Sequence, residues 1–230
     1  MTDKFIIKNN VLVGHEFSSE EVVDVVVPQG VIAIGENLFR GYKNIKNITI
    51  PNGVGCIDNA AFQSCTGLKS VVIPGSVLLI CGFAFDYCEN LQVVVMEKGV
   101  RNISSYAFSN CEKLMAVTIP DSVKDIDDGA FSCCESLPTI TIPGSVAVIS
   151  PNVFSQCSNL QSAVLRDGVI AIRDGAFADC SSLQTIIIPG SVNKIAADAF
   201  DFCENLTIHA PAGSFAEQYA KEKNIPFVAT

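Results

Sequence analysis

Apolar residues recur along this chain with a period of 23 residues. A phenylalanine stands at the same place in eight consecutive units, and no insertion or deletion interrupts the frame. These residues are Phe39, Phe62, Phe85, Phe108, Phe131, Phe154, Phe177 and Phe200. A fixed period of this length is typical of a solenoid, in which each unit forms one layer and buries its apolar edge against the next layer.

Each unit contains the signals for a strand, a turn and a second compact segment. The β-branched run Val71–Ile73 predicts a short strand with Val71 and Ile73 pointing inward and Val72 pointing outward. Pro74 then ends the strand, because it has no N–H for a ladder and favours a turn. Later in the unit, a phenylalanine and a cysteine lie three residues apart, a spacing that predicts one helical turn.

The two ends of the chain depart from the repeat and are expected to cover its open layers. We assign residues 1–24 to an N-terminal cap, residues 25–206 to the eight repeats and residues 207–230 to a C-terminal cap of the same single domain. In the first cap, residues 5–7 and 11–13 are apolar and predict strands. In the second, Ser214 and Glu217 are spaced as a capping box, which predicts a helix over 214–223.

The full pattern of a unit is L-x-x-V-x-I-P-x-x-V-x-x-I-x-x-x-A-F-x-x-C, and it resembles the BspA-like leucine-rich repeats of bacteria and some protozoa. The resemblance covers about residues 20–210. It implies an α/β fold: a right-handed, curved leucine-rich-repeat solenoid with a parallel sheet on its concave face and short helical turns in the repeats. For some members it also implies adhesion to host or bacterial surface proteins. The family brings no catalytic residues, and its members differ in function.

Composition narrows the classes of partner. The chain is 49% hydrophobic and 17% charged, with a net charge of −9, so we expect it to bind neither nucleic acid nor anionic lipid. Apolar runs long enough to insert into a bilayer are missing from the sequence. The first ten residues lack the continuous apolar region of a signal peptide. The cytoplasm and, by resemblance, the cell surface or secretion after removal of an export signal both stay open.

The ten cysteines do not have the spacing of a metal site. Seven of them occupy one position of the repeat, so a 23-residue period separates them, and no C-x₂₋₄-C pair is present among them. We expect these thiols to be small buried apolar groups. The remaining Cys56, Cys81 and Cys133 lie off this position and are expected to be half-buried or exposed, so a reactive thiol should be sought there first.

The residues that usually carry catalysis are sparse. His15 and His209 lie in opposite caps, with no third partner in view for a catalytic triad. Asp127 and Asp128 are adjacent but are not followed by a calcium-binding loop, and no glycine-rich phosphate loop occurs. We therefore expect no metal, no cofactor and no enzymatic activity.

The outward positions of the predicted strands are the best candidates for a function. This face is nearly uncharged and in part apolar, and an exposed apolar patch often marks an interaction site. Two units carry a charged residue, Glu97 or Arg166, in place of the turn proline. The candidate partner-binding residues are Val72, Val93, Val95, Glu97, Thr118, Thr141, Val164 and Ile187.

Three functional hypotheses follow. The first is a non-catalytic protein-interaction or adhesion module that binds a protein along the concave face. The second is a passive structural spacer within a larger surface protein. A threonine-rich face that orders water is a weaker third, because only three of the eight central outward positions are threonine.

Overall fold

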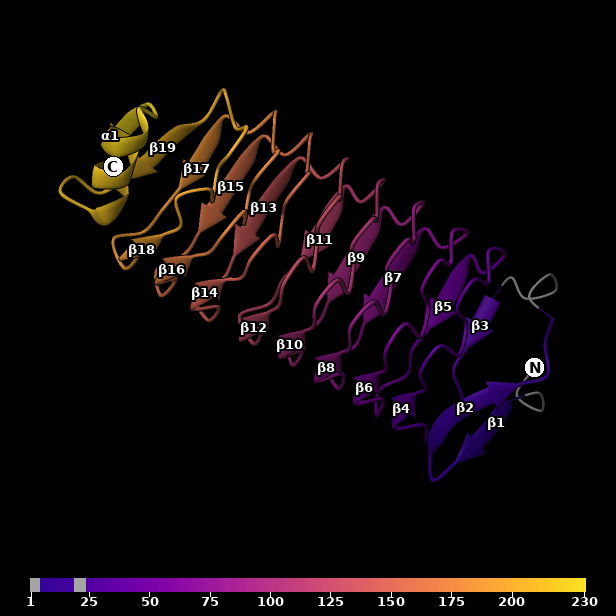
Figure 1. Cartoon of the computed structure of the whole chain (residues 1–230). Coiled ribbons are helices and arrows are strands. Elements are labelled where there is room, and N and C mark those ends of the chain that lie inside the picture. Colours follow the sequence, from indigo (N-terminus) through magenta and orange to yellow (C-terminus); the bar gives the residue numbers. More distant parts are fainter. Residues whose placement is uncertain (1–4, 19–23) are drawn as a thin grey trace.

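The computed structural model describes residues 5–18 and 24–230, which form a parallel β-solenoid (Figure 1). Each layer has three sides. The long-strand face is built from β3 (Asp24–Val26), β5 (Asn47–Thr49), β7 (Ser70–Ile73), β9 (Val93–Met96), β11 (Ala116–Thr118), β13 (Thr139–Ile142), β15 (Ser162–Leu165), β17 (Thr185–Ile187) and β19 (Thr207–Ala210). The short-strand face is built from β4 (Ala33–Ile34), β6 (Cys56–Ile57), β8 (Leu79–Ile80), β10 (Asn102–Ile103), β12 (Asp125–Ile126), β14 (Val148–Ile149), β16 (Ala171–Ile172) and β18 (Lys194–Ile195). The third side, the turn edge, is the segment around each phenylalanine.

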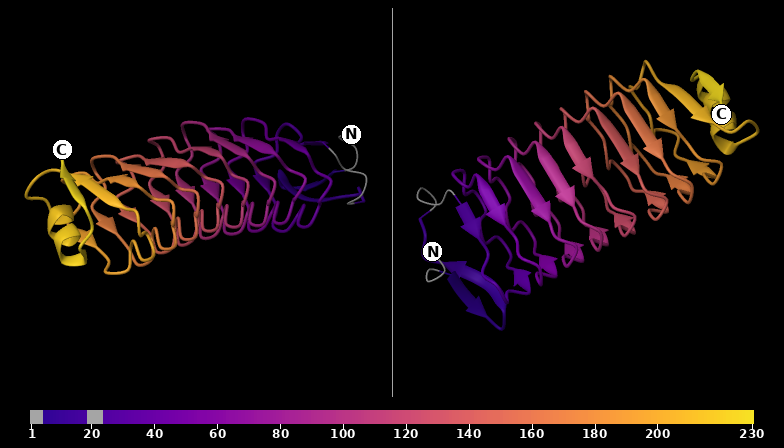
Figure 2. Two further views of the ribbon diagram at one scale, coloured as in Figure 1. Left: turned by 90° about the horizontal axis from the view of Figure 1, so that it is seen from above. Right: turned by 180° about the vertical axis from the view of Figure 1, so that it is seen from behind.

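The register between layers equals the sequence period. Val72 of β7 lies opposite Val95 of β9, and Val95 lies opposite Thr118 of β11. Every residue of a layer therefore sits beside its equivalents in the neighbouring layers, and identical side chains stack in columns. Figure 2 shows these layers in a single row, with the two chain ends at opposite ends of the row.

The central column of the core is the row of phenylalanines. Neighbouring rings are stacked nearly parallel, with centroids 5.1–5.7 Å apart. All eight phenylalanine side chains are buried. The His15 ring continues the stack beyond Phe39 at 5.1 Å, while Tyr219 closes the other end with its ring edge-on to Phe200 at 6.0 Å. The caps therefore supply rings for both open ends of the column.

The helical turn expected around each phenylalanine is wrong. Tyr106 and Asn110, two residues to either side of Phe108, have positive φ angles of 58° and 56°. The Phe108 N–H donates to the Ala130 carbonyl of the next layer at 2.8 Å instead of bonding within its own segment. A helix would use that N–H internally, whereas the solenoid uses it to join layers. Phenylalanine and cysteine share a face because the segment consists of two tight turns.

The fold is consequently a parallel β-solenoid with little helix rather than the α/β arrangement that the family resemblance implied. Within the described parts of the chain, the one helix is α1 (Phe215–Lys223) in the C-terminal cap. No helix in those parts has the length and apolar character needed to cross a bilayer.

The described part of the N-terminal cap is a hairpin that begins the short-strand face. Strand β1 (Phe5–Lys8) pairs antiparallel with β2 (Val11–His15), and β2 pairs parallel with β4. Residues 1–4 and 19–23 of the expected cap lie outside the described residues. The hairpin thus covers the first short strand.

The C-terminal cap consists of α1 and β20 (Phe227–Ala229), which pairs with β19. The Ser214 hydroxyl accepts a hydrogen bond from the Glu217 N–H, as a helix N-cap does. The Glu217 carboxylate accepts from the Gly213 N–H at 2.6 Å, one residue before the N-cap that a standard capping box would use. Ala216, Tyr219 and Ala220 are the buried residues of the helix.

Phe108→Ala should destabilise the protein by about 3–5 kcal/mol, because it leaves a cavity between two stacked rings. The unfolding midpoint in urea measures the loss. Phe202→Ala is the control, since the Phe202 side chain is 70% exposed and its truncation should change the midpoint little. Equal losses of unfolding free energy in the two variants would contradict the conclusion that Phe108 stabilises the protein by packing between the rings of neighbouring layers.

Candidate interaction surface

All eight candidate partner-binding residues lie on the long-strand face or at its rim. Val72, Val95 and Ile187 are exposed by 50%, 37% and 41%, and the other two valines are half-buried. Glu97, Thr118 and Thr141 are also exposed. The structure brings the outward side chains into two rows, one of Val72, Val95 and Thr118 and one of Thr141, Val164 and Ile187.

The two rows are separated by an interruption of the sheet between β11 and β13. Among residues 5–18 and 24–230, no strand ladder joins these two neighbours, and the short-strand sheet is also interrupted at this layer boundary, between β12 and β14. The turn edge stays connected, since the Phe131 N–H donates to the Val153 carbonyl at 2.9 Å. In the described parts of the chain these two layers are therefore joined by hydrogen bonds at the turn edge and, just before the long strands, from the Ser136 N–H to the Glu112 carbonyl at 2.9 Å, but not by a strand ladder.

Pro138, the residue before β13, provides a physical reason for the interruption. In the equivalent position of the neighbouring layers, the Met115 N–H donates to the Gln92 carbonyl and the Gln161 N–H donates to the Pro138 carbonyl. Pro138 has no N–H and cannot donate to the Met115 carbonyl. A proline is compatible with a strand only where the ladder is not needed, so this layer boundary loses the hydrogen bond that begins each long-strand pair.

The interruption uncovers core side chains. Val117 and Ile119 are partly exposed, although their equivalents in the other described layers are buried. A second interruption, between β5 and β7, has no such effect, since Ile48 and Ile50 remain buried. Of these two interruptions of the long-strand sheet, only the one at Pro138 is accompanied by partly exposed core residues, Val117 on β11 and Ile119 just after it.

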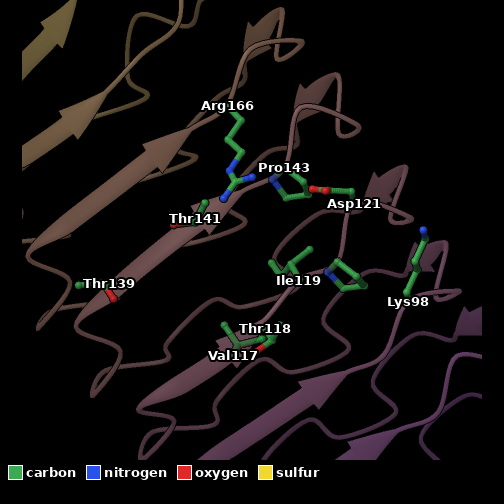
Figure 3. A pocket seen from close by; sticks show the side chains of 10 residues that line it. Lys98, Val117, Thr118, Ile119, Asp121, Thr139, Thr141, Pro143 and Arg166 are labelled. Atoms are coloured by element: carbon green, nitrogen blue, oxygen red, sulfur yellow. The ribbon is translucent and has the colours of Figure 1, made fainter.

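A cleft of about 540 Å³ opens at this boundary (Figure 3). Its volume falls within the range of ligand pockets, about 300–1,000 Å³. Threonine hydroxyls and apolar groups line the cleft, and two cations and one carboxylate stand around it. The lining residues are Lys98, Val117, Thr118, Ile119, Pro120, Asp121, Thr139, Thr141, Pro143 and Arg166.

The charges around the cleft differ in sign from the protein as a whole. Lys98 and Arg166 contribute two positive charges and Asp121 one negative charge, whereas the chain carries a net charge of −9. Figure 3 shows the Arg166 side chain extending over the β13 side of the cleft near Thr141, with Lys98 on the opposite side. The cleft thus combines uncovered apolar surface with a locally positive rim.

The two charged residues that replace the turn proline have different surroundings. The Glu97 carboxylate accepts a hydrogen bond from the Gly75 N–H at 3.2 Å, so it already serves the turn of the preceding layer. Arg166 lines the cleft instead. Sequence reasoning placed Glu97 among the candidate residues and left out Arg166, Val117 and Ile119. Pro138 is the sequence signal that could have identified these three residues, because it removes one of the N–H groups that donate from layer to layer just before the long strands.

The repeated cysteines have a hydrogen-bonding role that the sequence did not reveal. Each of the seven thiols donates to the carbonyl oxygen of the phenylalanine one layer back, at 3.1–3.3 Å. Six of these cysteines are buried, while Cys203 in the last layer is half-buried. Burial raises the pKa of the Cys65 and Cys157 thiols to about 12. Thiols with such pKa values are poor nucleophiles at neutral pH.

A separate group of exposed aromatic side chains lies on the turn edge. Phe83 and Tyr106 are 43% and 39% exposed, and their rings stack at 5.3 Å. Both residues have positive φ angles, 59° and 58°, which bulky residues seldom adopt. This pair is a second apolar surface, away from the long-strand face, and it was not among the sequence candidates.

The residues considered for chemistry are dispersed. His15 is part of the aromatic column, where its Nε2 lies 3.1 Å from the Leu38 carbonyl, and His209 is on β19 near the other end. Across the described ranges, no cluster of three or more His, Cys, Asp or Glu side chains is arranged to hold a metal ion.

Comparison with known proteins identifies similar sequences and folds. The family model described as the BspA-type leucine-rich repeat region matches residues 12–108 and 79–207, with six copies. No curated protein matches significantly. The resemblance noted from the repeat pattern is confirmed by this family match.

Two solved structures of leucine-rich repeat proteins are similar to this chain in both sequence and fold. A leucine-rich cell surface protein from Faecalibacterium prausnitzii A2-165 is 28% identical, with a TM-score of 0.56 over 87% of this chain and 62% of that one. The chain thus spans less than two thirds of that protein. A leucine-rich repeat protein from T. pallidum is 25% identical, with a TM-score of 0.69 over 78% of this chain and 87% of that one. The pneumococcal vaccine antigen PcpA, at 14% identity and a TM-score of 0.58, shares the fold.

Pro138→Gln should restore the missing donor, because glutamine occupies this position in the equivalent places Gln92, Gln161 and Gln184. We expect the amides of residues 139–142, which both proteins possess, to exchange with deuterium about five- to tenfold more slowly in the variant, as one added hydrogen bond of about 1 kcal/mol implies. The free energy of unfolding should change little, since losing proline's rigidity costs about 0.4–1 kcal/mol. Unchanged exchange would show that Pro138 does not hold the ladder open.

The six buried ladder thiols should resist modification in the native protein. An aromatic disulfide reagent is expected to label at most the four half-buried cysteines before denaturation and all ten after it. The number of released chromophores measures this directly. Rapid labelling of seven or more thiols in the folded protein would contradict the burial of the column.

Proposed function

Because this chain belongs to the BspA-type leucine-rich repeat family, we propose that it is a non-catalytic module that binds a protein partner along its long-strand face. This is the sheet that the family resemblance led us to expect on the concave side of the solenoid. Leucine-rich repeat folds typically mediate protein interaction. Solenoids offer an extended surface on which many layers contact one ligand.

The cleft between β11 and β13 is the observation that carries the proposal. It lies between the two rows of outward side chains and exposes Val117 and Ile119, which the repeat would otherwise bury. Burying apolar surface there contributes about 25 cal/mol per Å² before the costs of association are subtracted. A hydrophobic side chain of the partner that enters the cleft would restore the cover that the interrupted ladder removes.

The flanking rows would extend the contact beyond the cleft. Val72, Val93 and Val95 supply apolar area on one side, and Val164 and Ile187 supply it on the other. The rim cations Lys98 and Arg166 suit carboxylates on the partner, which gives orientation and specificity. The partner we propose therefore has an apolar anchor flanked by acidic side chains.

A surface protein of a host or of another bacterium is the class of partner we propose. The similarity of this chain to a protein described as a leucine-rich cell surface protein supports a partner that is also exposed at a cell surface. A passive spacer would not require an interruption that exposes core residues in the middle of a face, so the cleft favours binding.

The proposal is tested with the double variant Val72→Asp and Ile187→Lys, whose charges lie in different rows of the long-strand face and cannot pair with each other. Purified extracellular-matrix and bacterial surface proteins are immobilised as an array and probed with the wild-type chain. For each protein that binds, the double variant should bind at least about tenfold more weakly, because a charge is buried in an apolar contact. Both side chains point outward, so circular dichroism and the unfolding midpoint should stay unchanged.

Control variants on the short-strand face and on the turn edge show whether the loss of binding is specific to the long-strand face. Leu78 and Ile170 are 46% and 43% exposed beside the short-strand face, so Leu78→Asp with Ile170→Lys places the same charges on another side. This control should bind like the wild type. Phe83→Ser with Tyr106→Ser tests the aromatic pair of the turn edge. Loss of binding in the turn-edge variant, with wild-type affinity in the long-strand variant, would place the site elsewhere and overturn the proposal.

A further inference from the structure

We infer that Cys56 and Cys81 form a thiol–disulfide exchange site, at which a small-molecule disulfide oxidises the pair to a bond between adjacent layers. Their Sγ atoms lie 3.6 Å apart, and both side chains are half-buried on the short-strand face. This site is independent of the long-strand face and of any partner bound there. It would act as a covalent tie between the layers that contain β6 and β8.

The position of the two cysteines explains why they meet. Cys56 begins β6 and lies opposite Leu79 of β8. Cys81 directly follows β8, two residues beyond Leu79, so its side chain projects to the same side of the sheet. The Cys81 N–H donates to the Ile57 carbonyl at 2.9 Å, which anchors its backbone beside β6. The sulfurs therefore face each other diagonally across two neighbouring strands.

The repeated cysteines show what is particular about this pair. Each ladder thiol donates to a phenylalanine carbonyl, and most of them are fully enclosed. The Cys56 and Cys81 thiols contact each other, Cys81 also hydrogen-bonds to Asp58, and both sulfurs are partly accessible to solvent. Their sequence separation is 25, not the 23 of the ladder, and this offset brings the two side chains into a diagonal contact.

The two thiols have different chemical characters. The hydrogen bond between the two thiols lowers the pKa of Cys56, although burial and the charge of Asp58 oppose the change. The same hydrogen bond, burial and Asp58 raise the pKa of Cys81. The Asp58 carboxylate accepts a hydrogen bond from the Cys81 thiol and disfavours its ionisation, so Cys56 is the better nucleophile and Cys81 the resolving thiol.

The reaction balances with glutathione disulfide as the two-electron oxidant. The Cys56 thiolate attacks one sulfur of glutathione disulfide, its S–S bond breaks, and one glutathione thiolate leaves. Cys81 then loses its proton to solvent and attacks the Cys56 sulfur of the mixed disulfide, which releases the second glutathione. The protein loses two hydrogen atoms, and one glutathione disulfide becomes two glutathione thiols.

The test uses the full, reduced chain in native buffer with glutathione disulfide, followed by acid quenching, alkylation of free thiols and mass mapping. We expect one internal disulfide, linking the peptides of Cys56 and Cys81, with native circular dichroism retained. In Cys81→Ser, a glutathione adduct should accumulate on Cys56 at least about tenfold above the wild type, because the resolving thiol is gone. Cys56→Ser should leave Cys81 largely unmodified.

Cys133→Ser is the control, because Cys133 is also half-buried but its Sγ contacts Ser132 and Gln156 instead of a second thiol. It should form the Cys56–Cys81 bond at the wild-type rate. Alanine replacements at 56 and 81 repeat the test without a new hydroxyl. Persistence of two free thiols, stable adducts on both cysteines of the wild type, or a bond to any other cysteine would each overturn the assignment.

Discussion

The connection between phenylalanine turns of neighbouring layers is the interaction on which this solenoid depends. Each ring stacks on the next, each phenylalanine N–H along the middle of the chain donates to the following layer, and each phenylalanine carbonyl accepts a thiol from that layer. At the boundary between β11 and β13, both strand faces are interrupted but this connection persists. The Phe131 and Phe154 rings are 5.7 Å apart there, the widest spacing between neighbouring phenylalanine rings of the column. The layers stay in register because the turn edge holds them.

This arrangement lets one side of the molecule vary without loss of the fold. A proline in a strand column would disrupt an ordinary central sheet, because every internal strand needs its N–H groups. Here Pro138 costs a ladder bond, but the turn edge and the remaining layers maintain the stack. The result is a cleft near the middle of the long-strand face. The residues that depart from the repeat thus lie at the two candidate sites. Pro138 and Arg166 are at the cleft, and Cys56 and Cys81 are on the short-strand face.

The segment around each phenylalanine shows why local patterns mislead in a repeat protein. A spacing of three between Phe85 and Cys88 is compatible with a helix or with tight turns. The structure uses turns because alternate N–H groups, such as those of Phe83 and Phe85, must reach carbonyls of the next layer. In the layers of Phe39 to Phe177, two residues of this segment take positive φ angles, even where the side chain is a tyrosine such as Tyr106. Stacking between layers overrides the local preference of the residue.

The sequence by itself determined the period, the inward columns and the family, because 23-residue repetition is a one-dimensional property that stacking preserves. It also identified the outward row from Val72 to Ile187, since strand alternation depends only on parity along the chain. Only the tertiary structure decided where that row is interrupted, which thiols meet and that His15 continues the aromatic column. These features arise from contacts between layers. The missing N–H of Pro138 and the 25-residue separation of Cys56 and Cys81, two more than the repeat period, each act on a residue in the neighbouring layer, 23 or more positions away in the sequence.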